Sequence, residues 1–190
     1  MSSVKHLKKL KYLKIILRKG CMQMKQKNVW ILSGTPGSGK SHFVKSRLGK
    51  NDVWVSRDAI RFSIVPETEE YFSKENEVVR MFYETMNKAI ENPKVENVYI
   101  DATHLNTAAR LKTIKAIAHT EYIEKLNCVH INTPLAECLR RNELREGRSV
   151  VPATVVRKMF SSYAKPTEIE GFDHYYVVDY QTDEIKEVSI

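Results

Sequence analysis

The sequence predicts an α/β fold: a three-layer sandwich with helices on both faces of a parallel five-stranded sheet. Two observations lead to this prediction. Short runs rich in Val, Ile and aromatic residues alternate with helical stretches along the chain, which is typical of parallel sheets. The first run also leads directly into a glycine-rich loop and a helix start at residues 34–41. Strand, loop and helix in this order form a recurring unit of such sheets.

Each expected element follows from a local pattern. A helix is expected to begin at Pro66, to carry apolar residues at helical spacing, and to end at Asn92-Pro93. Pro134 and Pro152 each suit the first turn of a helix. We expect strands near residues 29–32, 53–56, 95–101, 126–131 and 174–178. We expect helices near residues 40–49, 66–91, 107–120 and 152–163, and from residue 134 onward.

Length and composition indicate one domain of intracellular type. A chain of 190 residues with 42% hydrophobic residues can form a single core. The cysteines (Cys21, Cys128 and Cys138) are odd in number and form no C-x-x-C pair, so we expect neither disulfides nor zinc. No apolar run approaches membrane-spanning length. We therefore expect a cytoplasmic protein with no membrane association.

The positive charge is concentrated in residues 1–27. Of the 31 Lys and Arg residues, nine lie in this stretch, which has no Asp or Glu, so 22 basic residues face 23 acidic ones in the rest. We expect a basic N-terminal extension over residues 1–27 and a single domain over residues 28–190. The extension could be a disordered leader, a packed segment, or an arm for nucleic acid or an anionic surface. It could also be untranslated, since Met22 and Met24 are alternative starts.

The glycine-rich loop fits the phosphate-binding pattern G-x-x-x-x-G-K-[ST] at every fixed position. Its glycines let backbone N–H groups approach a phosphate, and the following helix start adds free donors. The alternative is an ordinary glycine-rich turn. The pattern predicts ATP binding by Gly34, Thr35, Pro36, Gly37, Ser38, Gly39, Lys40 and Ser41. Lys40 would contact the β- and γ-phosphates, and Ser41 would bind Mg²⁺.

Charged residues follow two of the predicted strands. Arg57, Asp58 and Arg61 come after the second strand, and Asp101 ends the third. Ligands bind at the carboxyl ends of strands in such sheets, so Asp58 could take a proton from an attacking hydroxyl, with Arg57 and Arg61 on the acceptor. The alternative is a helix cap with surface arginines. Asp101 is a candidate to hold Mg²⁺ through water.

Two further segments are candidates for the same site. Thr103, His104 and Asn106 follow Asp101 directly and could line the site, although a lone histidine is more often a cap or loop donor. The arginine-dense stretch 140–148 could form a small lid, with Arg141 and Arg145 on the donor phosphates. The alternative is a solvated charged helix.

With these residues in place, the chain resembles the kinase domain of bacteriophage 5′-polynucleotide kinases, within the wider P-loop kinase family that includes zeta toxins and small-molecule kinases. The resemblance covers residues 28–163. It is carried by the phosphate loop, by the block Ser56-Arg57-Asp58-Ala59-Ile60-Arg61, by Ile100-Asp101-Ala102-Thr103, and by the arginine stretch leading into Val151-Pro152. It implies a nucleotide-kinase-like P-loop NTPase fold with a small arginine-rich lid.

The resemblance also implies roles for residues. Asp58 would be the general base on a 5′-hydroxyl, Arg61 would contact the neighbouring phosphate, and Arg145 would act on the donor phosphates, with Lys40 also catalytic. Thr103 would belong to the substrate side. A phage origin would place the protein in the host cytoplasm. The D-x-D-x-[TV] motif of the phage phosphatase domain does not occur at the end of this chain, so we expect no 3′-phosphatase activity.

Three functions are consistent with these residues. The leading hypothesis is transfer of the γ-phosphate of ATP to the 5′-hydroxyl of DNA or RNA, with nucleic acid 5′ ends as substrate. The first alternative is a kinase of a small hydroxylated metabolite, nucleoside or nucleotide sugar. The second alternative is an ATP-binding switch module with slow hydrolysis.

Overall fold

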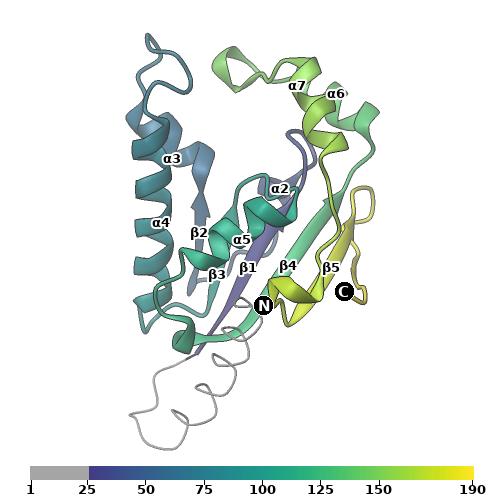
Figure 1. The fold of residues 1–190 in the computed structure, drawn as a ribbon. Coiled ribbons are helices and arrows are strands. Elements are labelled where there is room, and N and C mark those ends of the chain that lie inside the picture. Colours follow the sequence, from purple (N-terminus) through teal and green to yellow (C-terminus); the bar gives the residue numbers. More distant parts are fainter. Residues whose placement is uncertain (1–25) are drawn as a thin grey trace, which may run out of the picture.

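The computed structural model describes residues 26–190 and has the predicted α/β architecture (Figure 1). Five strands are parallel, and β6 pairs antiparallel with β5 at the edge of the sheet. The strand order is β2-β3-β1-β4-β5-β6. The strands are β1 Lys27–Ser33, β2 Asp52–Ser56, β3 Asn97–Asp101, β4 Ile123–Asn132, β5 His174–Asp179 and β6 Ile185–Glu187.

The sixth strand extends the predicted five-stranded sheet into a mixed one. All three residues of β6 are exposed, so its sequence carries no burial pattern from which it could be predicted. The predicted extension over residues 1–27 lies outside the described residues except for its end, where Lys27 is the first residue of β1.

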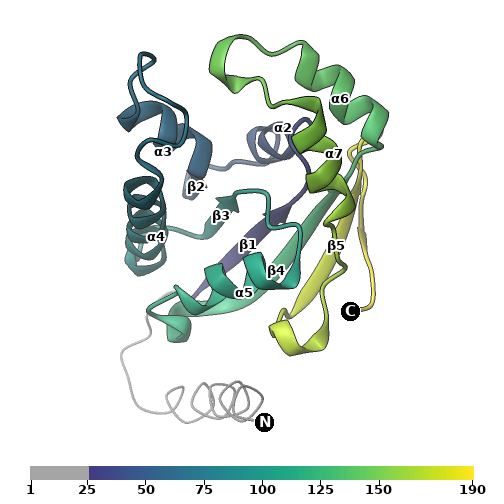
Figure 2. The same cartoon turned by 45° about the horizontal axis from the view of Figure 1, so that its top comes forward.

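Helices cover both faces of the sheet, as Figure 2 shows from a second direction. One face packs against α4 and the segment after α5, and the other packs against α2. The helices are α2 Lys40–Lys45, α3 Arg57–Ile64, α4 Glu75–Glu91, α5 Thr107–Lys115, α6 Leu135–Glu143 and α7 Ala153–Ser161. Short 3₁₀ turns lie at Thr120–Tyr122, Gly147–Ser149 and Glu168–Glu170.

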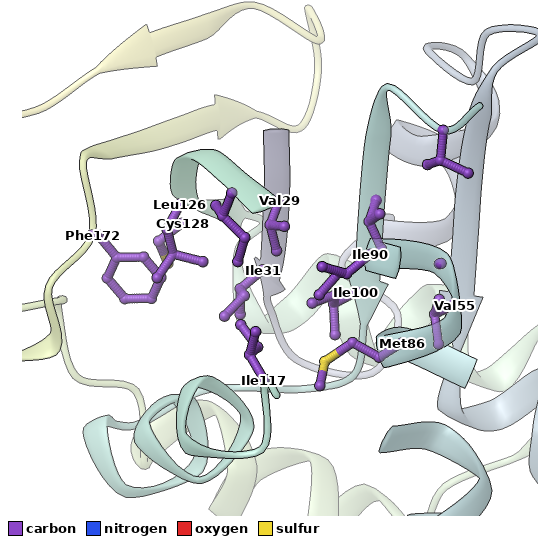
Figure 3. Close-up of a cluster of buried hydrophobic side chains, with 14 of the residues drawn as sticks. Val29, Ile31, Val55, Met86, Ile90, Ile100, Ile117, Leu126, Cys128 and Phe172 are labelled. Atoms are coloured by element: carbon purple, nitrogen blue, oxygen red, sulfur yellow. The ribbon is translucent and has the colours of Figure 1, made fainter. Parts of the chain in front are cut away.

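The larger core lies between the sheet and α4. Val29 and Ile31 of β1 and Ile100 of β3 are fully buried there and meet Met86 and Ile90 of α4 (Figure 3). Burial of such side chains contributes about 1.5–3 kcal/mol each. This core fixes the central strands, and therefore the positions of the loops at their carboxyl ends.

The helix predicted over residues 66–91 was wrong at its start. Residues 57–64 form a separate helix, α3, because the Ser56 side chain accepts a hydrogen bond from the Ala59 backbone and caps it. Residues 66–74 form turns, and α4 begins only at Glu75. The acidic residues between Pro66 and Glu75 therefore belong to a connection that stands beside the carboxyl ends of the strands.

Strand register brings the predicted site residues to one edge of the sheet. Asp101, the last residue of β3, lies opposite Ser56 of β2 and Leu32 of β1. Because all three strands are parallel, the loops that follow them share this edge. Among residues 26–190, no helix is long and apolar enough to cross a membrane.

Candidate active site

The phosphate loop is a backbone structure that needs glycine. Gly37 and Gly39 have φ angles of 85° and 105°, which L-residues with a Cβ rarely adopt. A Cβ on Gly37 would also overlap the backbone carbonyl of Cys138 in α6. The loop is therefore packed directly beneath α6, the first helix of the predicted lid.

Lys40 holds its ammonium group inside this loop. Its Nζ donates to the carbonyl oxygens of Gly34 at 2.8 Å and Thr35 at 3.2 Å. Burial lowers the pKa of Lys40, although the negative charges of Asp101 and Asp58 oppose that shift. The cation is thus held in a weakly hydrated position, where its field on a phosphate would be strong.

Ser41 and Asp101 meet across the carboxyl ends of β1 and β3. The Ser41 hydroxyl donates to Asp101 Oδ2 at 3.3 Å, and the indole N–H of Trp54 donates to the same oxygen at 3.1 Å. Burial raises the pKa of Asp101, which is 5% exposed, while the charge of Lys40 opposes the shift. Sequence reasoning did not find Trp54, whose indole orients this carboxylate from β2.

The phosphate loop and Asp101 form one wall of the site, and a hydrogen-bond network around Arg61 forms the other. The Arg61 side chain is 4% exposed and donates to Asp58 Oδ1 at 2.8 Å, to Glu75 Oε2 at 2.6 Å and to the Tyr71 hydroxyl at 3.1 Å. Tyr71 in turn donates to Asp58 Oδ1 at 3.0 Å. Asp58 itself stays 65% exposed, so this network orients a carboxylate that still faces the open site.

Glu75 is the anchor of this wall, and sequence reasoning missed it. It pairs with both Arg57 and Arg61. Burial would raise the pKa of Glu75, but the hydrogen bonds from Arg61 and Arg57 outweigh it and hold that pKa below its usual value. Glu75 lies inside the stretch predicted as one helix over residues 66–91, and no local signal separated it from its acidic neighbours.

The loop after β3 braces the phosphate loop from below. The Thr103 carbonyl accepts a hydrogen bond from the Gly34 N–H at 3.0 Å, and His104 bonds to the Leu32 carbonyl and the Thr113 hydroxyl. Burial lowers the pKa of His104 to about 4. Thr103 borders the main cavity, whereas His104 is buried and Asn106 caps α5.

Three of the four arginines in the predicted lid make contacts around the cavity. Arg141 donates to Glu137 and to the Ser38 carbonyl, and its guanidinium lies 5.7 Å from the ring centre of Tyr180. Arg145 borders the cavity and donates to the Ser149 carbonyl. Arg148 crosses to the opposite wall and donates to the carbonyls of Val65 and Pro66. The lid segment is thereby joined to the connection after α3.

A cavity of about 720 Å³ brings these groups together. Gly34 and Thr35 do not border the cavity. Their backbone carbonyls accept the hydrogen bonds of Lys40. The predicted residues that line the cavity are Pro36, Gly37, Ser38, Gly39, Lys40, Ser41, Arg57, Asp58, Arg61, Asp101, Thr103, Arg141 and Arg145. Sequence reasoning did not propose Phe72, Tyr180, Gln181 or Asp183 as lining residues; Tyr180–Asp183 follow β5.

The donor side of the cavity fits a nucleoside triphosphate with Mg²⁺. The hydroxyl of Ser38 is buried without a hydrogen-bond partner among the described residues, and such a group is usually satisfied by a ligand or an ordered water. Ser41 and Asp101 supply adjacent oxygens of the kind that Mg²⁺ prefers. Within residues 26–190, no three His, Cys, Asp or Glu side chains form a metal cluster.

These features define a P-loop kinase fold: an α/β sheet, a phosphate loop after β1, and charged groups converging on one cavity. A family model described as an AAA domain (AAA_33) matches residues 29–166, and the chain belongs to this family.

Solved structures share the fold at low sequence identity. A chain of the Pnkp1/Rnl/Hen1 complex is 23% identical with a TM-score of 0.52, over 64% of this chain and 41% of that chain. A fungal RNA kinase is 14% identical with a TM-score of 0.53, over 84% and 78%. A gluconokinase from Sinorhizobium meliloti 1021 is 16% identical with a TM-score of 0.50, over 85% and 86%. The chain thus spans less than half the length of the Pnkp1/Rnl/Hen1 chain that it matches.

Proposed function

We propose that this protein transfers the γ-phosphoryl group of ATP to the 5′-hydroxyl of DNA or RNA, in the cytoplasm. The observation that carries the proposal is that Asp58 and Lys40 open into one cavity, although they belong to different walls. A phosphate held at Lys40 would face a hydroxyl held at Asp58. Phosphoryl transfer needs this alignment more than it needs covalent chemistry from the protein.

Asp58 suits the role of general base. Its two hydrogen bonds, from Arg61 and Tyr71, both end on Oδ1. Among residues 26–190, no side chain or backbone group donates a hydrogen bond to Oδ2. That oxygen would accept the proton of the acceptor hydroxyl. The hydroxyl oxygen then forms a bond to the γ-phosphorus as the bond to the β–γ bridging oxygen breaks, and ADP leaves with the electron pair.

The cations of the donor side would offset the charge that spreads over the transferred group. Lys40 would lie against the β- and γ-phosphates, and Arg141 and Arg145 would approach from the lid. Ser41, and Asp101 through water, would hold Mg²⁺, whose positive charge would offset part of the phosphate charge.

The polynucleotide acceptor is supported by two observations. Arg57 and Arg61 line the wall beside Asp58, where the first phosphate of an acceptor strand would lie. The matched fungal protein is an RNA kinase, and the matched Pnkp1/Rnl/Hen1 assembly is an RNA repair complex. At these identities the likenesses establish the fold, so the acceptor remains a proposal.

A small hydroxylated metabolite is the second candidate acceptor. A gluconokinase and a sugar kinase share the fold at TM-scores of 0.50, and residues 28–190 carry 22 basic against 23 acidic residues. A near-neutral domain has no strong general attraction for a polyanion. Activity on small acceptors that does not weaken with salt would favour this candidate.

The test is transfer of labelled γ-phosphate from ATP to a short oligonucleotide with a 5′-hydroxyl. We would compare the full chain, a version starting at Met24, Lys40→Ala and Asp58→Ala. We expect label on the 5′ end with the full chain and none with either point variant, and the Met24 version shows whether the basic extension contributes. If ATP binds but no oligonucleotide is labelled, the proposal is wrong, and small hydroxylated acceptors are the next to assay.

A further inference from the structure

One aromatic side chain that borders the cavity is largely exposed. Phe72, in the turns between α3 and α4, borders the main cavity and is 65% exposed. Phe62 and Phe160, the other two phenylalanines among the exposed large apolar residues, are 40% and 37% exposed. A phenyl ring exposed at the wall of a cavity is the kind of surface that a flat apolar ligand face covers.

Phe72 is also held in place beside the proposed base. Its ring lies 4.8 Å from that of Tyr71 at 89°, in an edge-on contact, and Tyr71 donates to Asp58. The Arg61 guanidinium lies over both rings, 4.5 Å from the centre of Tyr71 and 5.3 Å from that of Phe72. The network that orients Asp58 therefore also orients an open aromatic face next to it.

We propose that Phe72 stacks on the nucleobase of the 5′-terminal nucleotide of the acceptor. The inference rests on the proposed function and specifies how that site recognises its acceptor. Asp58 and Phe72 border the same cavity, and in a terminal nucleotide one sugar carries both the 5′-hydroxyl and the nucleobase. Stacking accepts every base, because each has a π-face, so this subsite selects nucleotides over other hydroxylated molecules without reading sequence.

The competing explanation is that Phe72 only supports Tyr71. In that case its removal would loosen Asp58 and reduce turnover on every acceptor alike. A stacking subsite instead affects binding, and only for acceptors that carry a terminal base. The two explanations can therefore be distinguished by comparing the Michaelis constants of two acceptors that differ only in the terminal nucleobase.

The experiment uses the full chain and two 5′-hydroxyl oligonucleotides that differ only in whether the terminal nucleotide has a base or is abasic. We expect the wild-type KM to be about 5- to 100-fold lower for the oligonucleotide with the base, the range for one stacked base. Phe72→Ala should abolish that ratio, and Phe72→Trp should keep it. Phe160→Ala, which removes a phenylalanine from a separate smaller cavity, should leave the ratio unchanged.

The outcomes separate this inference from the proposed function. A wild-type enzyme that phosphorylates both oligonucleotides with equal KM overturns the stacking subsite alone. A Phe72→Ala variant that loses the same factor in kcat on both also overturns it, in favour of support for Tyr71. If the wild type phosphorylates neither oligonucleotide but does phosphorylate gluconate, the proposed function fails together with the inference.

Discussion

The two walls of the cavity are built in different ways. The phosphate loop at the centre of the donor wall is one stretch, residues 34–41, whose shape is set by glycine φ angles and by backbone contacts with α6. The acceptor wall joins Asp58 and Arg61 of α3, Tyr71 of a turn and Glu75 of α4. A phosphate site can therefore be specified by a short motif, whereas the acceptor side depends on contacts between separate elements.

The two walls also differ in how their positive charges are used. The donor cation Lys40 is bonded only to neutral carbonyls among the described residues, so its charge is available to a phosphate. Arg61 is paired with two carboxylates and covered by two rings. This pairing holds Asp58 in position, and Arg61 still borders the cavity. The donor wall is built to bind charge, and the acceptor wall is built to orient a base.

Removing Asp58, the proposed general base, should show the difference between the two walls most clearly. Asp58→Asn keeps an oxygen for Arg61 and Tyr71 but cannot accept the proton, so we expect kcat to fall by about 10²- to 10⁴-fold. ATP affinity should not change, because Asp58 is not on the donor wall. Rapid-quench measurement of phosphoryl transfer, with an independent titration of ATP binding, checks both. A variant with full activity would show that the hydroxyl needs no base at this position.

Removing the donor cation should have a slightly smaller effect on turnover and a different effect on binding. We expect Lys40→Ala to reduce kcat by about 10²- to 10³-fold, as loss of one group that stabilises developing charge does, and to weaken ATP binding. Lys45→Ala is the matched control, since Lys45 is exposed at the end of the same helix. Equal losses in the two lysine variants would refute a specific role for Lys40.

The contrast between the walls also explains what could be predicted from the sequence. The fold class follows from alternating strands and helices, and the phosphate loop from a fixed spacing. Glu75 and Trp54 could not be predicted as site residues, because their roles depend on partners 14 and 47 residues away in sequence. The start of α4 was placed wrongly because an acidic run after Pro66 looks the same in a helix and in a turn.

His104, which lies in the loop after β3 behind the phosphate loop, should make the free energy of unfolding depend on pH. Burial lowers the pKa of His104 from 6.5 to about 4, and Arg57, Lys40 and Arg110 add to that shift. Between these values the unfolded chain binds more protons than the folded one, so the free energy of unfolding falls as the pH falls. From about pH 7.5 to about pH 5 the expected loss from His104 is about 2 kcal/mol.

His104→Asn tests this dependence without removing the backbone conformation. His104 has a φ of 40°, which asparagine tolerates better than most residues, and an amide N–H can still donate to the Leu32 carbonyl. Burial lowers the pKa of His130 to about 4 as well, so the variant should retain about half of the combined loss. Urea unfolding at the two pH values measures it. An unchanged loss in the variant would exclude His104 as a source.

Removing the charge of Glu75 should have the smallest effect on activity among these variants, and its effect is the most informative about the two walls. Glu75→Gln removes the negative charge that holds Arg57 and Arg61. Charge-assisted hydrogen bonds contribute about 1.5–3 kcal/mol, so we expect kcat/KM for the acceptor to fall by about tenfold or more. Glu77→Gln, two residues along the same helix and half exposed, should behave as wild type.

ATP affinity in the Glu75→Gln variant decides whether the walls are independent. Glu75 bonds to Arg57 and Arg61, and Arg61 bonds to Asp58, so these contacts lie on the acceptor wall. Arg148 joins the lid to the connection after α3 rather than to α4. We therefore expect ATP binding, measured by calorimetric titration, to be unchanged. If ATP affinity falls by the same factor as acceptor efficiency, the two walls act as one unit, and the phosphate loop depends on a helix whose start was predicted wrongly.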